Sequence, residues 1–516
     1  MRRLRYSLVH LLVLAALCLG SATQRADARE ARASVEILGR GTSWETPAYV
    51  LEGPGTGPTV LIVGGQHGNE PAGAEAADQI RHWTLRRGRL VVVPRANVRA
   101  LTVRKRHTPG VDRRVRNLNR NFPRLPRDAR RGDDDRVAVT DPPRGEVAPA
   151  LWKLIETHQP DWLLDLHEGF AAHGVHPKSC GHSVIVHPEQ VDARVVANLM
   201  IEAVNGTIPS EAHRFVRLRQ ITRSTLARSA ADHLGVRTLI LETCFSSGPL
   251  SRRTRRHRVM VCALLQRLGM LEQGVGVDTV LPGRRAVDRL RVAVYDAEGT
   301  GGPGVPRALA QIGGAAGTTV VRVCAEDIRS GVLAGFDVVT FTGGSGSRQG
   351  RALGERGRAR VRTFVLDGGG FVGVCAGAYL ALANFTWSLG ILDGKTISPK
   401  WRRGRGQVEI EPTAAGGTAL AVPPSRVAVR YGNGPVFEPF GSEEIPDYEV
   451  WVRYCTELAE GGAPPGVMID SPAIAAGSFG EGRVVVIGPH PEQTRGLEAW
   501  LPRAARWAAG VERAPR

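Results

Sequence analysis

The sequence predicts two α/β domains in tandem, each a three-layer α/β/α arrangement with helices on both faces of a sheet. At 516 residues the chain is too long for one ordinary hydrophobic core. Short apolar runs without alternation recur in both halves, separated by helical stretches. This pattern is typical of parallel strands buried on both faces. No run of 18 apolar residues follows residue 30, so we expect no internal membrane span.

The first 28 residues have the three-part layout of a secretory signal peptide. A basic start (residues 1–5) precedes an almost wholly apolar run (11–20) and a small-x-small site (26–28). An uncleaved N-terminal anchor is the alternative. Cys18 does not indicate lipidation, because a leucine precedes it where a small residue is needed. We therefore expect a periplasmic or secreted protein.

The formal net charge of +18 raises the question of an anionic partner. Only five of the 68 basic residues are lysine, and the arginines are spread along the whole chain. A coding bias toward arginine explains this pattern, so we expect no specific nucleic-acid partner. An acidic cell-envelope polymer suits an exported protein better.

The cysteines exclude two further classes of protein. Six cysteines follow Cys18, scattered and without a CxxC pair, so the chain is neither a disulfide scaffold nor a zinc ribbon. Cys180 and Cys244 remain candidates for a bridge in an oxidising compartment.

The expected elements divide the chain into two units. In the first, residues 35–275, strands are expected at 60–63, 90–94, 162–166 and 238–242, and helices at 71–80 and 147–157. The charged, proline-containing stretch 124–143 indicates an exposed loop. Residues 276–289 have the composition of a linker. The second unit, 290–516, has strands expected at 291–295, 319–323, 337–341, 371–374 and 483–487.

Three distant segments of the first unit supply the ligand types of a zinc site. His67 and Glu70 follow a strand and two glycines, and His167 ends another strand, as does Glu242. Ligands gather outside the carboxyl ends of strands in an open parallel sheet. Two imidazoles and one carboxylate, with a fourth position open, are typical of a catalytic zinc. The set indicates hydrolysis of an amide-like bond; the alternative for His67 is a core histidine.

Together these segments resemble the zinc carboxypeptidase superfamily, and within it the succinylglutamate desuccinylase/aspartoacylase branch, over roughly residues 40–245. The resemblance implies a mixed sheet of the zinc-carboxypeptidase type. It also implies that His67, Glu70 and His167 are the metal ligands and that Glu242 is the catalytic glutamate. A glutamate in that place can take a proton from water and hand it to the leaving amine.

The same resemblance assigns the substrate-binding residues. Asn119 and Arg120, in the LNRNFP stretch, match the pair that holds the substrate's carboxylate, and a guanidinium offers a fixed fork for such a group. A surface ion pair is the alternative for Arg120. Arg106 matches the arginine that polarises the scissile carbonyl, with Arg104 as the alternative because spacing alone aligns them. Glu168 should face the opposite side of its strand from the neighbouring metal ligand.

The substrate stays open at the level of sequence. The family's substrate-capping tyrosine loop has no clear equivalent in residues 205–240. A small peptide, a peptidoglycan-derived stem peptide and an N-acyl amino acid all remain candidates.

The second unit contains the elements of a thiol centre. Cys375 lies between glycines, after an expected strand and before a helical run, which permits a sharp turn that exposes the thiol. His490 and Glu492 follow another strand two residues apart, so they can act in series on that thiol. The glycine-rich residues 343–346 offer backbone N–H groups for an oxyanion. Nucleotide binding by this stretch is disfavoured because no Lys-Ser/Thr pair ends it.

These motifs, with the stretch 431–437, resemble the class I glutamine amidotransferase-like fold over roughly residues 290–500. The variant at the N-terminus of some biotin–protein ligases is the most similar. The resemblance implies a flavodoxin-like sheet and a triad of Cys375, His490 and Glu492. An active cysteine hydrolase and a binding or vestigial module are both open.

The sequence thus predicts an exported zinc-dependent hydrolase that cleaves an amide bond next to a free carboxylate, followed by an amidotransferase-like domain. Two alternatives remain. One is a cell-envelope binding protein in which neither centre turns over, and the other is an amidohydrolase that depends on Cys375.

Overall fold

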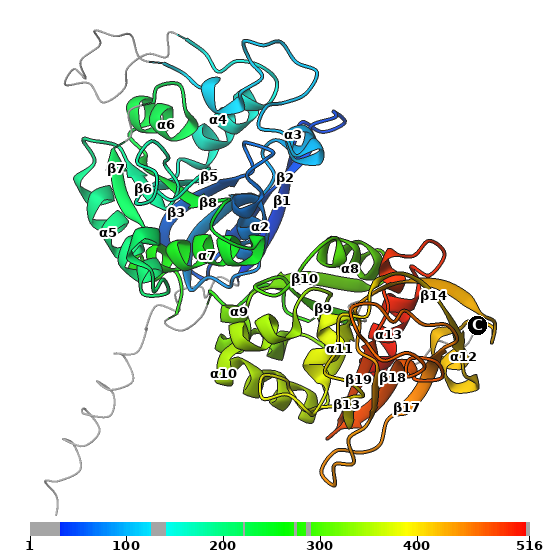
Figure 1. The fold of residues 1–516 in the computed structure, drawn as a ribbon. Helices are drawn as coiled ribbons and strands as arrows, with labels where there is room; N and C mark the ends of the chain where they lie inside the picture. Colours follow the sequence, from blue (N-terminus) through cyan, green and yellow to red (C-terminus); the bar gives the residue numbers. More distant parts are fainter. Residues whose placement is uncertain (1–30, 125–140, 220–221, 273–275, 285–289, 512–516) are drawn as a thin grey trace, which may run out of the picture.

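The structure is a computed structural model and describes residues 31–124, 141–219, 222–272, 276–284 and 290–511 (Figure 1). The expected signal peptide (1–28) and most of the expected loop at 124–143 lie outside the described residues. Within the described part of the chain, no helix is long and apolar enough to cross a membrane.

The first unit is built on an eight-stranded mixed sheet in the order β1-β2-β4-β3-β5-β8-β6-β7. Its strands are β1 (Arg32–Leu38), β2 (Thr46–Glu52), β3 (Gly55–Gly64), β4 (Arg87–Val93), β5 (Trp162–Gly169), β6 (Ser183–Val186), β7 (Val216–Arg219) and β8 (Arg237–Cys244). The central strands β4, β3, β5 and β8 run parallel. The pairs β1–β2, β2–β4 and β6–β8 are antiparallel.

Helices cover both faces of this sheet (Figure 1). The helical elements are α2 (Pro71–Ile80), α3 (Val98–Val103), η1 (Leu118–Arg120), α4 (Val147–His158), α5 (Val191–Asn205), η2 (Glu211–His213), α6 (Leu226–Leu234) and α7 (Leu250–Arg267). One core cluster joins the sheet to α2, α5 and α7, and a second joins it to α4 and α6. The three-layer prediction is confirmed for this unit.

The second unit is built on a nine-stranded sheet in the order β10-β9-β11-β12-β19-β18-β17-β14-β15. Its strands are β9 (Leu290–Tyr295), β10 (Thr318–Val323), β11 (Val338–Phe341), β12 (Gly370–Val374), β14 (Arg405–Pro412), β15 (Val427–Gly432), β17 (Glu449–Tyr454), β18 (Pro472–Phe479) and β19 (Gly482–Ile487). The first five strands in that order are parallel and have the flavodoxin-like order 2-1-3-4-5. The remaining four extend the sheet antiparallel.

Helices flank this sheet as well. They are α8 (Gly304–Gly313), α9 (Ala325–Ser330), η3 (Val332–Gly335), α10 (Gly346–Leu366), α11 (Ala376–Ala381), α12 (Ala414–Leu420), η4 (Pro491–Gln493) and α13 (Trp500–Ala508), while β13 (Gly394–Thr396) and β16 (Phe437–Pro439) form a separate ribbon. One core cluster lies under α9, α10 and α11. The other lies under α8, α12 and α13.

The segment between the two units is packed along part of its length. Val280 and Leu281 are buried in a core cluster of the second unit, and the Trp83 indole N–H donates to the Thr279 carbonyl. Residues 285–289 lie outside the described part of the chain. The division into 35–275, a linker at 276–289 and 290–516 therefore stays a prediction.

Candidate metal centre and thiol centre

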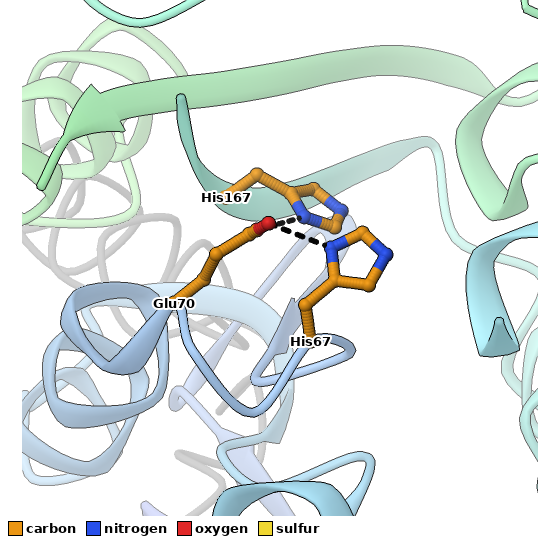
Figure 2. A group of neighbouring side chains, drawn as sticks. All are labelled: His67, Glu70 and His167. Atoms are coloured by element: carbon orange, nitrogen blue, oxygen red, sulfur yellow. Dashed lines mark hydrogen bonds and ion pairs between the residues drawn. The ribbon is translucent and has the colours of Figure 1, made fainter. Parts of the chain in front are cut away.

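The three expected metal ligands meet at the carboxyl ends of two parallel strands. His67 lies in the turn after β3, Glu70 is the residue before the first turn of α2, and His167 lies near the end of β5 (Figure 2). All three are buried, and one ligand atom from each lies within 4.8 Å of the others. The convergence predicted from sequence is present.

Both imidazole rings present Nδ1 to the carboxylate. Glu70 Oε1 lies 2.9 Å from His67 Nδ1, and Glu70 Oε2 lies 2.8 Å from His167 Nδ1 (Figure 2). The two ring centroids are 5.0 Å apart. Two nitrogens and a carboxylate thus point at one small volume.

The opposite edge of each ring is held by a polar side chain. Asp165 Oδ2 lies 3.0 Å from His167 Nε2, and Asn117 Oδ1 lies 3.1 Å from His67 Nε2. A hydrogen bond from the far ring nitrogen fixes the tautomer and leaves the near nitrogen free to bind a metal. Both histidines are therefore oriented with Nδ1 as the ligand atom.

Two observations show that these residues fit a divalent cation. His67 Nδ1 is buried and has no partner with hydrogen-bond geometry among the described residues, which is costly unless another group binds it. Although burial favours the neutral ring, Asp165 and Glu70 raise the pKa of His167 well above its usual value, so the carboxylates around the ring create a negative site that a metal cation can occupy in place of the proton. The donor set, nitrogen and carboxylate oxygen, suits zinc and related metals.

Glu242 lies directly beside this group. It is the register partner of His167 on the neighbouring parallel strand, so both side chains leave the same face of the sheet. Burial, with the charges of Glu70 and Asp165, raises the pKa of Glu242 to about 8. A divalent cation nearby favours the ionised carboxylate, which is the form that accepts a proton.

The expected substrate-binding residues surround the same position. Arg106 Nη1 contacts Glu70, so the structure places Arg106 at the metal group. The Asn119 side chain is buried, and both of its polar atoms are hydrogen-bonded within the protein. Its Nδ2 donates to Asp165 at 3.4 Å, and its Oδ1 accepts the Leu226 N–H at 2.8 Å. Arg120 is exposed, with Nη1 donating to the Asn119 carbonyl. The substrate roles of these residues stay predictions.

Two residues at this site were missed at the level of sequence. Asp165 and Asn117 hold the far edges of the two histidine rings. Asp165 had a detectable signal, since it precedes His167 by two residues in a strand and must share its face. Asn117 lies next to the LNRNFP stretch but had no signal of its own, because its pairing depends on how a loop folds.

Glu168 faces the other side of the sheet, as expected. Its Oε2 accepts the Ala72 N–H of α2 at 2.8 Å, and its Oε1 pairs with Arg253 of α7. Burial raises the pKa of Glu168, while Arg253 opposes that effect. The residue next to His167 thus anchors the strand to two helices.

Helix α7 also forms the junction with the second unit. Arg252 pairs with Glu298 and lies 3.0 Å from Glu326. Six residues further along, Arg258 is buried and pairs with Asp327 of α9, while its Nη1 donates to Gln79 of α2 at 2.7 Å. The helix that supports the metal group is therefore fixed by charges of the second unit.

The second unit places the predicted thiol at a strained turn. Cys375 follows β12 and precedes α11, with φ 51° and ψ −96°, a conformation that residues with a side chain rarely adopt. A Cβ on Gly373 would lie 2.3 Å from the Gly377 carbonyl oxygen. The glycine spacing around the cysteine is thus required for the strand and helix to pack closely.

His490 and Glu492 complete the predicted triad. His490 Nδ1 lies 2.8 Å from Glu492 Oε1. Burial favours the neutral ring, but hydrogen bonds with Cys375 and Glu492 outweigh it and raise the pKa of His490 to about 10. The ring packs against Gly343, where a Cβ would lie 2.8 Å from Cε1.

The six cysteines in the described residues are free thiols. Cys180 and Cys244, which the sequence left as a candidate pair, are among them. No disulfide therefore contributes to either centre within the described part of the chain.

Comparison with known families identifies both units. Residues 56–263 match the succinylglutamate desuccinylase/aspartoacylase catalytic domain, and residues 291–398 match the family described as biotin-protein ligase, N terminal. The chain therefore carries a succinylglutamate desuccinylase/aspartoacylase-type catalytic domain followed by a domain of the biotin-protein ligase N-terminal family. The second match includes Cys375 and ends before His490.

A curated relative is similar to part of the chain. N-alpha-acetyl-L-2,4-diaminobutyric acid deacetylase of Halomonas elongata is 33% identical over 132 residues. The alignment covers 25% of this chain and 33% of the relative. The chain thus spans about a third of the length of the curated relative that it matches.

Solved structures with a likeness to the chain include three enzymes or enzyme relatives. The mDAP-bound form of Helicobacter pylori Csd4, described as a D,L-carboxypeptidase, is 21% identical with a TM-score of 0.34, covering 42% of this chain and 52% of that one. The product-bound ectoine utilization protein EutE (DoeB) of Ruegeria pomeroyi is 21% identical, TM-score 0.34, covering 48% and 70%. An aspartoacylase family protein of Mesorhizobium loti is 24% identical, TM-score 0.34, covering 51% and 74%.

Proposed function

We propose that the first unit is a zinc-dependent hydrolase that cleaves an amide bond next to a free carboxylate, as a metallocarboxypeptidase does. The observation that carries the proposal is the convergence of two Nδ1 atoms and the Glu70 carboxylate beside Glu242. A match to a family of amide hydrolases supports it. The deacetylase of Halomonas elongata acts, by its name, on an N-acetylated amino acid, which makes N-acyl amino acids and small peptides the substrates to test.

A zinc ion held by His67, Glu70 and His167 would supply Lewis acidity at this position, an effect worth several kcal/mol of transition-state stabilisation. Glu242 takes the proton of the attacking water and passes it to the departing amine. Arg106 stabilises the negative charge that develops on the carbonyl oxygen, a contribution of about 3 kcal/mol in comparable sites. Arg120 holds the substrate's carboxylate through its planar fork.

A panel of matched substrates tests this proposal. Each N-acyl amino acid or peptide is offered as the free acid and as its carboxamide, with and without a chelator. We expect the free acid to be hydrolysed with a kcat/KM about 10- to 100-fold higher, the range for a lost charged hydrogen bond. Arg120→Gln should remove this preference, whereas Arg40→Gln, on an exposed turn, should keep it. Equal rates for acid and carboxamide would contradict the carboxylate requirement.

The rival is a cell-envelope binding protein with inactive centres. Zinc-loaded protein that hydrolyses no member of the panel, with Glu242→Ala binding the same compounds equally well, would favour the binder. A peptidoglycan-derived stem peptide belongs on the panel because it presents an amide next to a carboxylate.

A second candidate function is a cysteine-dependent amidohydrolase centred on Cys375. The observation that favours it is the strained backbone at Cys375 together with the bonded pair His490–Glu492. Activity that survives a chelator and disappears in Cys375→Ala would assign turnover to this centre.

We further propose that the chain is exported after cleavage of residues 1–28. N-terminal sequencing of the mature protein should begin at Arg29. Mature protein that retains Met1 would rule cleavage out.

A further inference from the structure

The cavity beside Cys375 is much larger than the triad itself, and most of its lining residues lie outside the triad. It has a volume of about 880 Å³, within the range of cavities that hold drug-sized ligands. Cys375 and Ala376 line it, together with the glycine-rich turn after β11. The thiol therefore borders a space that can hold a ligand of this size.

The wall of this cavity is cationic. Arg351, Arg402 and Arg405 line it, against a single carboxylate, Glu460. All three arginines are exposed. Among the described residues, none of the three has a carboxylate within ion-pair distance, whereas many arginines elsewhere in the chain have one; Arg252, Arg255 and Arg258 are examples.

The cationic surface continues past the cavity. A second hollow of about 330 Å³ shares Arg405 and is also lined by Arg430 and Arg495. Neither of these has a carboxylate within ion-pair distance in the described part of the chain. Five arginines without a carboxylate at ion-pair distance in the described residues thus line two hollows that share Arg405, and the larger hollow also contains Cys375. Guanidinium groups bind carboxylates through paired hydrogen bonds.

Aromatic side chains form the rest of the wall. Phe385 and Trp387 stack with centroids 4.5 Å apart, and Trp401, which is 49% exposed, lies under the guanidinium of Arg402. Flat apolar surface beside cations suits a ligand that has both carboxylates and apolar backbone or side-chain surface. The thiol attacks a carbonyl carbon, so the ligand must present an amide rather than a phosphate ester.

We propose that this cavity binds the carboxylates of a short acidic peptide and presents one of its amide carbonyls to Cys375. The cleavage part rests on the second candidate function above. The Cys375 sulfur forms a bond to the carbonyl carbon as the C–N bond breaks, and the thiol proton passes through His490 to the departing amine. Water then breaks the thioester, giving the carboxylic acid and restoring the thiol.

Binding and turnover are tested separately, so that failure of one is distinguishable from failure of the other. Binding is measured by calorimetry on full-length Cys375→Ala protein with an N-acetylated tetraglutamate amide and with its tetraglutamine isostere. We expect the acidic peptide to bind at least tenfold more tightly. Arg351→Gln and Arg402→Gln, each added to Cys375→Ala, should weaken that peptide about tenfold and leave the isostere unchanged. Arg356→Gln, an exposed change on the same helix as Arg351, is the control.

Turnover is measured in a Glu242→Gln background, which silences the first centre. Release of amine that requires Cys375 and favours the acidic peptide would support the whole proposal. Tight binding without release would retain the binding site and reject the cleavage step along with the second candidate function. Equal binding of the two peptides, or an unchanged affinity in both arginine variants, would overturn the proposal. Inorganic phosphate that displaces the peptide at equal concentration would show a general anion site instead and would overturn it as well.

Discussion

Replacing Glu242 with glutamine is expected to lower kcat for amide hydrolysis about 100- to 10,000-fold, the range for loss of a general acid–base group. The amide cannot accept the water's proton, although it fills nearly the same volume. The metal ligands are untouched, so the bound metal should remain. Initial rates on the best substrate of the panel, together with elemental analysis of both proteins, measure the effect.

Two controls make this result specific. Glu211→Gln replaces an exposed carboxylate of η2 and should leave kcat unchanged. Thermal unfolding of the Glu242 variant should match that of the parent. A variant that keeps full activity would remove Glu242 from the reaction, and one that loses its metal would make it a ligand instead.

Replacing Asp327 with alanine is expected to lower the free energy of unfolding by about 3–5 kcal/mol, the usual cost of breaking a buried ion pair by removing one partner. Arg258 would stay buried opposite the lost carboxylate, and the side chains of this pair are each 1% exposed. Denaturant titration of the full chain measures the loss. Asp78→Asn, which breaks an exposed pair with Arg81, should cost no more than about 1 kcal/mol.

The same pair predicts a dependence on pH. Burial alone would raise the pKa of Asp327, but Arg258 and Arg255 hold it below its usual value. A carboxyl with a lowered pKa contributes stability above the ordinary aspartate pKa of about 3.9, and that stability is lost as the pH falls through the lower folded value. The difference in stability between parent and variant should therefore shrink below about pH 4. A difference that stayed constant down to pH 2 would contradict the ion pair.

Much of the fold was predictable because the central strands are apolar on both faces. The runs at 60–63, 162–166 and 238–242 became β3, β5 and β8, and the helix expected at 71–80 is α2. The antiparallel extension of the second sheet was not predicted. In β14 and β15 buried and exposed residues partly alternate, since one face is less covered. Because these strands contain polar residues and glycine, their sequences resemble those of loops and did not predict strands.

The positions of the candidate metal ligands were predictable for the same reason as the central strands. His67, Glu70, His167 and Glu242 each end or follow a strand, so parallel topology alone brings them to one edge. Asn119 shows the limit of this reasoning, because its side chain bonds to Asp165 and to the Leu226 N–H. Such contacts depend on how the loop before α4 folds over the sheet. The ion pairs between α7 and the second unit could not be predicted either, since the sequence does not show which arginines contact another domain.

Elemental analysis of the purified full-length protein, alongside His67→Ala and His167→Ala, tests the central claim most directly. We expect one zinc per chain in the parent, less than a tenth of that in each variant, and hydrolysis that returns when zinc is restored to chelated parent protein. Undiminished metal content in both variants would contradict the assignment, as would hydrolysis by the parent that continues at full rate without zinc.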